Sequence, residues 1–125
     1  GAAGVDLNRN FPTFWEDGHM GGDNNKGAAP LSQWEARLIN QLLEEFKPHA
    51  LIDLHSGTEA LMMPFGMPGH PNPDKEAHQV FLAEIQRRHC PECRVGGTWE
   101  VEQYPNPGTV VDHAFSALGV KSSFL

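Results

Sequence analysis

Apolar side chains recur at helical spacing after an opening segment, residues 1–30, that is rich in glycine and is predicted to be loop. The regular spacing begins at Ser32, which together with Glu35 fits a capping box. Pro48 would end this helix because proline cannot continue it. We therefore predict an amphipathic helix. Its apolar positions are Trp34, Leu38, Ile39, Leu42, Leu43 and Phe46.

Two further stretches carry the same helical pattern. Asp74 is placed to cap a helix that runs to about Arg88. Thr109 and Asp112 are placed to cap a last helix, which we expect to end at Gly119. The inward face of the middle helix is predicted to consist of Ala77, Phe81, Leu82 and Ile85.

Short apolar runs bounded by turn residues predict the strands. The runs cover residues 49–55, 61–65, 94–103 and 120–125. Strands that alternate with helices indicate an α/β domain built on a sheet. No internal repeat or linker divides the sequence, so we expect a single domain over residues 1–125.

The composition excludes some classes of partner. With 39% apolar residues and a mean hydropathy of −0.43, the 125 residues have the composition of an ordinary soluble domain. No run approaches the roughly 20 apolar residues that a membrane helix needs. A formal net charge of −7 would repel a phosphate backbone, so nucleic acid is not an expected partner. Seven histidines are many for this length and raise the expectation of a metal.

Cys90 and Cys93 form a C-x-x-C segment beside His89. This spacing is compatible with half of a zinc site, a redox pair, a local disulfide or an ordinary turn at a helix end. No second C-x-x-C completes a structural zinc site, and no strand precedes the segment as in a thioredoxin-like unit. We favour the ordinary turn, and the compartment of the protein stays open.

One loop places an amide next to a guanidinium, within the segment GVDLNRNFP from Gly4 to Pro12. Arg9 stays charged, and its planar fork can meet a carboxylate with two hydrogen bonds. Asn8 adds a neutral donor beside it. The pair is therefore predicted to hold a carboxylate, such as the C-terminus of a peptide.

His55 ends the first predicted strand and is followed by Ser56 and Gly57. A neutral imidazole at a strand end is a suitable zinc ligand, and catalytic zinc usually takes three protein ligands and a water. Zinc lowers the pKa of that water to about 7, which supplies hydroxide at neutral pH. We therefore predict that His55 is a metal ligand.

These two motifs, in this order, resemble the zinc carboxypeptidases of the carboxypeptidase A/B family. The resemblance implies a mixed-sheet α/β fold with helices on both faces, one Zn²⁺ ion and removal of C-terminal residues from peptides. It also implies that Asn8 and Arg9 hold the terminal carboxylate and that His55 ligates the zinc. Ser56 matches a residue that contacts the penultimate residue of the substrate.

Two more positions match the family in the segment YPNPGTVVD, from Tyr104 to Asp112. Tyr104 matches a mobile tyrosine that closes over the substrate and excludes water. Val111 matches the base of the pocket that sorts family members by side-chain preference, and a valine there implies an apolar pocket. The neighbouring Asp112 is expected to point away from the pocket, toward the helix cap.

The resemblance covers essentially the whole chain but only the middle of the family's domain. The family's zinc site also uses an upstream His-x-x-Glu pair. In this chain only His89 has a glutamate at that offset, Glu92, and the intervening Pro91 would break a helix. The family's catalytic glutamate follows the last strand, beyond Leu125. We therefore expect a partial catalytic domain, which is inactive alone and prone to self-association at its open edges.

Two other interpretations stay open. Aspartoacylase-like zinc amidohydrolases use an Asn-Arg-x-Phe-Pro segment, which residues 8–12 satisfy, and they would cleave acyl-amino acids. A pseudoenzyme would bind a terminal carboxylate without cutting. The Tyr104 loop and the His-Ser-Gly segment favour the peptidase, whose partner is a peptide or peptide-like substrate with a free C-terminal carboxylate.

Overall fold

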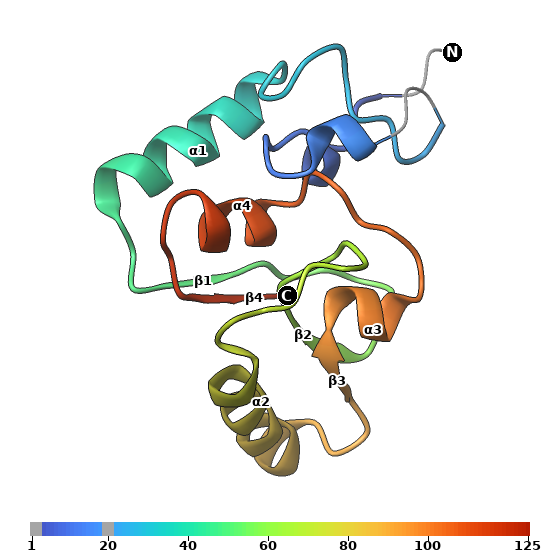
Figure 1. Cartoon of the computed structure of the whole chain (residues 1–125), viewed down its shortest axis with the longest axis vertical. Coiled ribbons are helices and arrows are strands. Elements are labelled where there is room, and N and C mark those ends of the chain that lie inside the picture. The colour runs from blue at the N-terminus through green and yellow to red at the C-terminus, as the bar shows by residue number, and fades with distance from the viewer. Residues whose placement is uncertain (1–3, 19–21) are drawn as a thin grey trace.

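The computed structural model describes residues 4–18 and 22–125 (Figure 1). None of the helices within these two ranges is long and apolar enough to cross a bilayer. The elements follow in the order η1 (Leu7–Arg9), η2 (Trp15–Asp17), α1 (Trp34–Phe46), β1 (Ala50–Ile52), β2 (Ala60–Met63), α2 (Lys75–His89), β3 (Arg94–Gly97), α3 (Thr98–Glu102), α4 (Val110–Ser116) and β4 (Ser122–Phe124), where η1 and η2 are 3₁₀ helices.

The strands form two parallel pairs that are joined into one mixed arrangement. β1 pairs with β4, and β2 pairs with β3. Met62 and Leu125 exchange both backbone N–H···O bonds, at 2.7 and 2.9 Å. That exchange is the pattern of an antiparallel pair. The strand order is therefore β3–β2–β4–β1, with parallel and antiparallel neighbours.

Helices lie on both sides of the strands. α4 contacts β1 and β4, whereas α2 and α3 contact β2 and β3. Figure 1 shows α4 and α2 on opposite sides of the strands, with α1 beyond α4. The larger hydrophobic cluster joins α1, α4 and the segment after η1, and it contains Phe11, Ala36, Leu43, Val110, Val111, Ala114 and Val120. A smaller cluster joins α2 to the strands and contains Met63, Leu82 and Phe124.

The start of α1 is organised by a distant amide, so the expected capping box of Ser32 and Glu35 is wrong. Gln33 occupies the N-cap position without a side-chain cap of its own. Its backbone N–H donates to Oδ1 of the fully buried Asn10 at 3.0 Å, and Nδ2 of Asn10 donates to the Ser32 hydroxyl at 3.0 Å. The Ser32 oxygen therefore serves Asn10 and not the helix.

The predicted inward faces of α1 and α2 are only partly right. α1 buries Ala36, Asn40 and Leu43, while five of its six predicted apolar positions are exposed: Trp34, Leu38, Ile39, Leu42 and Phe46. α2 buries His78 and Leu82 and half-buries Ile85, but Ala77 and Phe81 are exposed. The buried faces include polar contacts: Asn40 of α1 meets His113 of α4, and His78 of α2 donates from Nε2 to the Lys121 carbonyl at 2.7 Å.

The two remaining caps differ in outcome. Asp74 occupies the N-cap position of α2, but its side chain caps nothing, and its own N–H donates to Asn72 Oδ1 at 2.8 Å. Thr109 caps α4 as predicted, because its hydroxyl accepts from the Asp112 N–H at 3.2 Å. α4 ends at Ser116, one turn before the predicted end.

The predicted strand over residues 94–103 is right only as far as Gly97. There the chain turns into α3, and the Glu100 carboxylate accepts a hydrogen bond from the Gly97 N–H at 3.0 Å. The hydrogen bond from Lys75 is the main reason that the pKa of Glu100 is lowered, and the Gly97 N–H adds to it. The carboxylate thus stabilises the first turn of a helix where the residue pattern indicated a continuing strand.

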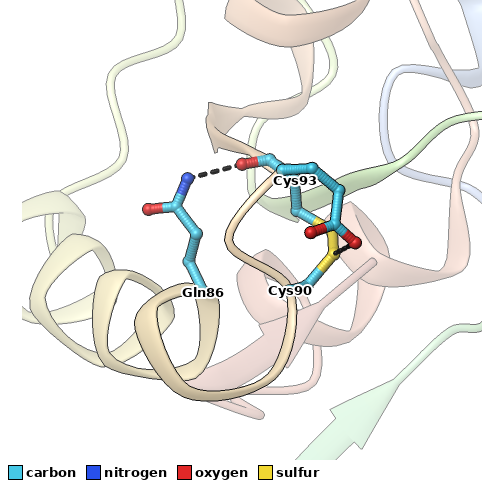
Figure 2. The surroundings of a disulfide bond; sticks show 4 residues. Gln86, Cys90 and Cys93 are labelled. Atoms are coloured by element: carbon cyan, nitrogen blue, oxygen red, sulfur yellow. Dashed lines mark hydrogen bonds between the residues drawn. A yellow bond between two sulfur atoms is a disulfide. The ribbon is translucent and has the colours of Figure 1, made fainter.

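Cys90 and Cys93 are joined by a disulfide in the turn that follows α2 (Figure 2). Their Cα atoms are 5.3 Å apart, and the Cys93 N–H donates to the Cys90 carbonyl at 3.0 Å. The side chain of Gln86, on the last turn of α2, donates to the Cys93 carbonyl. The segment does lie at a helix end, but the favoured interpretation of an ordinary turn is wrong, because the two cysteines form the local disulfide that stood among the alternatives.

Candidate functional site

The predicted site residues gather around one cleft of about 350 Å³. Its wall is contributed by η1, the segment after β1, β2, α2, the end of α3, the loop before α4 and β4. Five of the six predicted site residues line it: Asn8, Arg9, His55, Ser56 and Tyr104. The structure thus brings together side chains from three distant parts of the sequence.

His55 lies in a small polar cluster within this cleft. Its Nε2 is 2.9 Å from Oδ2 of Asp53 and 3.1 Å from Nδ2 of Asn8. Asn8 Nδ2 also donates to Asp53 Oδ2 at 3.1 Å, while Asn8 Oδ1 accepts from the Val110 N–H at 2.9 Å. Asp53 was not among the predicted site residues, although its position two residues before His55, on the same face of an extended segment, was an available signal.

Arg9 is half-buried beside this cluster. Its Nη1 donates to the Asn8 carbonyl at 2.8 Å, and its Nη2 donates to Asn106 Oδ1 at 2.5 Å. A guanidinium has five N–H groups. Within the described part of the chain these two bonds leave three N–H groups that a ligand could engage. Asn106 is buried and was not predicted as a site residue. It therefore orients the guanidinium group and leaves the other N–H groups available to a ligand.

Tyr104 stands at the rim of the cleft and is 47% exposed. A hydrogen bond to the Glu102 carboxylate raises the pKa of the Tyr104 hydroxyl, and burial adds to this shift. The backbone of the loop is fixed more firmly than this side chain, because Asn106 donates from its N–H to the Gly66 carbonyl at 2.8 Å and from Nδ2 to the Tyr104 carbonyl at 2.9 Å. The Tyr104 side chain thus stands in a well-anchored loop, with its hydroxyl group hydrogen-bonded to Glu102.

Gly108 brings the loop of residues 103–109, here called the tyrosine loop, into contact with the backbone of Arg9 and Phe11. Its carbonyl accepts from the Phe11 N–H at 3.0 Å, and its φ of +73° is in the left-handed region. A Cβ at this position would lie 2.4 Å from the Arg9 carbonyl oxygen. Glycine is therefore required here, both by the backbone conformation and by the close approach of Arg9.

Ser56 and Val111 lie in contrasting places. Ser56 is exposed in the loop after His55 and lines the cleft. Val111 is 1% exposed and packs in the cluster with Phe11 and Ala114, so the structure places it in the core behind the tyrosine loop and not in the wall of this cleft. Its role as a pocket base stays a prediction.

Asp112 is fully buried next to Val111, and its carboxylate does not serve the helix cap as expected. Oδ2 accepts from the Gly66 N–H at 2.9 Å, and only the backbone N–H of Asp112 takes part in the cap. Burial raises the pKa of Asp112 to about 7, against the opposing effects of the Gly66 hydrogen bond and the positive charge of Arg9. Its surroundings therefore favour the neutral form of this carboxyl group.

The described residues do not fit a catalytic zinc ion by themselves. Such an ion takes three protein ligands. Within residues 4–18 and 22–125 no three histidine, cysteine, aspartate or glutamate side chains are grouped to hold a metal. His55 has one candidate donor nitrogen, and the nearby Asp53 oxygen is already shared between His55 and Asn8. His19, a further histidine, lies outside the described residues.

Comparison with known proteins agrees with this geometry. The family model described as zinc carboxypeptidase matches residues 2–125. Mast cell carboxypeptidase A from Homo sapiens is 30% identical over 137 residues, which cover 97% of this chain and 31% of that protein. Carboxypeptidase A2 from Rattus norvegicus is 32% identical over 138 residues, covering 99% and 31%. The chain thus spans about a third of the length of these relatives.

Solved structures show the same fold. Bovine thrombin-activatable fibrinolysis inhibitor, in complex with tick carboxypeptidase inhibitor, superimposes with a TM-score of 0.85 at 25% identity, over 97% of this chain and 44% of that one. Carboxypeptidase A from Helicoverpa armigera superimposes with a TM-score of 0.89 at 21% identity, over 98% and 32%. With the match of the family model to nearly every residue, these findings show that the chain belongs to the zinc carboxypeptidase family.

Proposed function

We propose that this chain forms the substrate-binding part of a zinc-dependent exopeptidase that removes C-terminal residues from peptides. The observation that carries the proposal is the half-buried Arg9 fork, anchored by Asn106 and open on its other N–H groups. A fixed guanidinium binds a carboxylate through two parallel hydrogen bonds. Only the last residue of a peptide carries a main-chain carboxylate, so this contact selects the chain end.

Three neighbouring residues make further contacts with the substrate. Asn8 has a second N–H on Nδ2, beyond the one donated to Asp53, which can reach the same carboxylate. Tyr104 turns from the rim toward the bound chain end, donates a hydrogen bond to it and excludes water. Ser56, exposed beside His55, contacts the penultimate residue. Each of these roles positions the last peptide bond.

The side-chain preference is proposed to be apolar. Leu61 and Met62 contribute apolar surface to the cleft. The nearest buried carboxyl group, Asp112, is bonded to the Gly66 N–H, and burial raises its pKa to about 7. It is therefore not a free negative charge that could receive a lysine or arginine side chain. We retain Val111 as the proposed pocket base because it matches the family motif, although it does not line this cleft.

His55 is the only residue of this chain to which we assign a role in metal binding. A zinc ion, when bound, supplies hydroxide at neutral pH. His55 is the one ligand we assign in this chain, and we propose that the other ligands and the catalytic glutamate belong to parts of the domain that this chain does not contain. The 125 residues alone are then expected to bind substrate ends without turnover.

A second candidate is a carboxylate-binding pseudoenzyme. It stays a candidate because the anchored Arg9 fork needs no metal ligand in order to bind a chain end. Such a protein would keep the Arg9 fork and the mobile Tyr104 but would release the peptide uncut. It differs from the peptidase in product formation and not in binding.

The test compares binding with turnover. N-acetyl-leucine is titrated into this chain, with N-acetyl-leucinamide as the uncharged control, and binding of the acid alone supports the carboxylate site. A pool of peptides and acyl-amino acids is then incubated with zinc and either this chain or the natural protein that contains it. Peptides shortened by one C-terminal residue support the exopeptidase. Release from acyl-amino acids alone identifies an amidohydrolase. Binding without any product from the natural protein identifies the pseudoenzyme, since this chain alone is expected to form no product in either case.

A further inference from the structure

Asp53 is fixed at the end of β1 so that its carboxylate faces the site. Its backbone N–H donates to the Phe124 carbonyl at 2.9 Å, which extends the β1–β4 pairing by one residue. The side chain is 23% exposed, and His55, two residues later, is 43% exposed. The two side chains meet at 2.9 Å. The carboxylate is therefore held by the sheet and not by a flexible loop alone.

The orientation of the Asn8 amide is determined independently of this pair. Its Oδ1 accepts from the Val110 N–H at 2.9 Å, and an oxygen is required there because an amide nitrogen cannot accept. Nδ2 must then face Asp53 and His55. The group that lies 3.1 Å from His55 Nε2 is consequently a donor and never an acceptor.

The proton on the His55 ring follows from these two neighbours. An ionised carboxylate only accepts hydrogen bonds, so the 2.9 Å contact with Asp53 requires a proton on Nε2. In a neutral ring Nδ1 then carries none. If the carboxylate were removed, the remaining neighbour of Nε2 would be the Asn8 donor, and the ring would place its proton on Nδ1 in order to accept.

We propose that Asp53 is a positioning residue, which fixes the tautomer of His55 and holds the Asn8 amide in the same cluster. It leaves Nδ1 of His55 with a free lone pair, the form of imidazole that accepts protons or binds a metal ion. It also joins the histidine to the carboxylate-binding pair, since Arg9 donates to the Asn8 carbonyl. This inference deepens the proposed function and rests on its assignment of Asn8 and His55.

The sharpest test is the tautomer itself, read from two-bond ¹H–¹⁵N correlation spectra of the ¹⁵N-labelled chain at about pH 8.5, where histidine rings are neutral. A His55→Gln variant assigns the His55 signals. The wild-type chain is expected to show the Nε2–H form, about tenfold in excess or more, because hydrogen bonds to charged groups are worth about 1.5–3 kcal/mol. The Nδ1–H form in the wild type would overturn the proposal without recourse to any variant.

Three variants test whether the Asp53 carboxylate itself sets the tautomer ratio of His55, and not a general effect of mutation. Asp53→Ala is expected to reverse the ratio to an excess of the Nδ1–H form, and Asp53→Asn, which keeps an acceptor oxygen, is expected to restore the Nε2–H form. Glu59→Gln removes an equal charge from the same exposed loop and should leave the ratio unchanged. An unchanged tautomer in a folded Asp53→Ala chain would refute the role of Asp53.

Titration with N-acetyl-leucine distinguishes this inference from the proposed function. Binding in the wild type, with movement of the Asn8 side-chain amide signals that weakens in Asp53→Ala, supports both. If the predicted tautomers are found but the wild type binds no acid, the carboxylate site is wrong and the role of Asp53 still holds. If the acid binds and Asp53→Ala changes neither the tautomer nor the affinity, the inference about Asp53 is wrong and the carboxylate site stands.

Discussion

The buried Asp112 makes a prediction about stability that depends on pH. Its carboxylate has one hydrogen bond, from the Gly66 N–H, and no cation in direct contact within the described residues. Burial raises the pKa of Asp112 from 3.8 to about 7. In Asp112→Asn the amide oxygen can still accept from Gly66, but the group can no longer ionise. The variant therefore isolates the cost of burying the charge.

The direction and size of the pH effect on the free energy of unfolding follow from the linkage between protonation and folding. The native chain holds the Asp112 proton up to about pH 7, whereas the unfolded chain releases it near 3.8. The contribution to stability is therefore complete below pH 3.8 and is lost as the pH rises through 7. A shift of about three pKa units corresponds to about 4 kcal/mol at 1.4 kcal/mol per unit, and partial relaxation around the charge makes about 2 kcal/mol a realistic lower figure.

The assay is urea unfolding of wild type and Asp112→Asn between pH 4 and pH 8.5, followed by circular dichroism. The free energy of unfolding of the variant, relative to wild type, should rise by about 2–4 kcal/mol across this range. The control is Asp23→Asn, since Asp23 is exposed and should give a flat difference. A flat difference for Asp112→Asn as well would show that the native carboxyl is not held in a protonated state, and the reasoning from burial would fail.

Three other predictions concern the site and the turn after α2. Gly108→Ala should destabilise the chain by more than about 2 kcal/mol, whereas Gly119→Ala, with the same φ of +73° and no atom near its Cβ, should cost only about 1 kcal/mol; urea unfolding measures both. Arg9→Lys should weaken N-acetyl-leucine binding at least about tenfold by calorimetry, while Arg88→Lys on exposed α2 should not. Reducing the disulfide should lower the free energy of unfolding by about 2 kcal/mol, as judged by urea titration with and without reductant.

Local patterns predicted the elements better than their ends and faces. The helical spacing before Pro48 and the apolar runs depend on neighbours in sequence, and the structure has helices and strands there. The start of α1 depends on Asn10, which is 23 residues away from Gln33, and no local pattern contains that contact. The buried face of α1 likewise includes Asn40, whose partner His113 lies 73 residues later and is outside any local pattern.

The candidate site shows the same contrast between residues predicted from local motifs and residues whose roles depend on distant contacts. Asn8, Arg9 and His55 were predicted as site residues because each belongs to a short motif with its own chemistry. Asp53 and Asn106 were missed because their importance lies in contacts across 45 and 97 residues, with Asn8 and Arg9 respectively. The position of Asp53 two residues before His55 can be read from the sequence, whereas its contact with Asn8 appears only in the fold.

The charges around the cleft explain why geometry, and not net charge, must select the substrate. Arg9 is the only lysine or arginine among the residues that line it, whereas Asp53 and Glu102 both contribute carboxylates. An approaching peptide carboxylate therefore meets more negative than positive charge, in a chain whose formal net charge is already −7. The residues of this chain therefore supply little long-range attraction, and their main contribution to affinity is the paired hydrogen bonds of one oriented guanidinium. That contribution accounts for an arginine held by Asn106 and by a glycine that brings the tyrosine loop against its backbone.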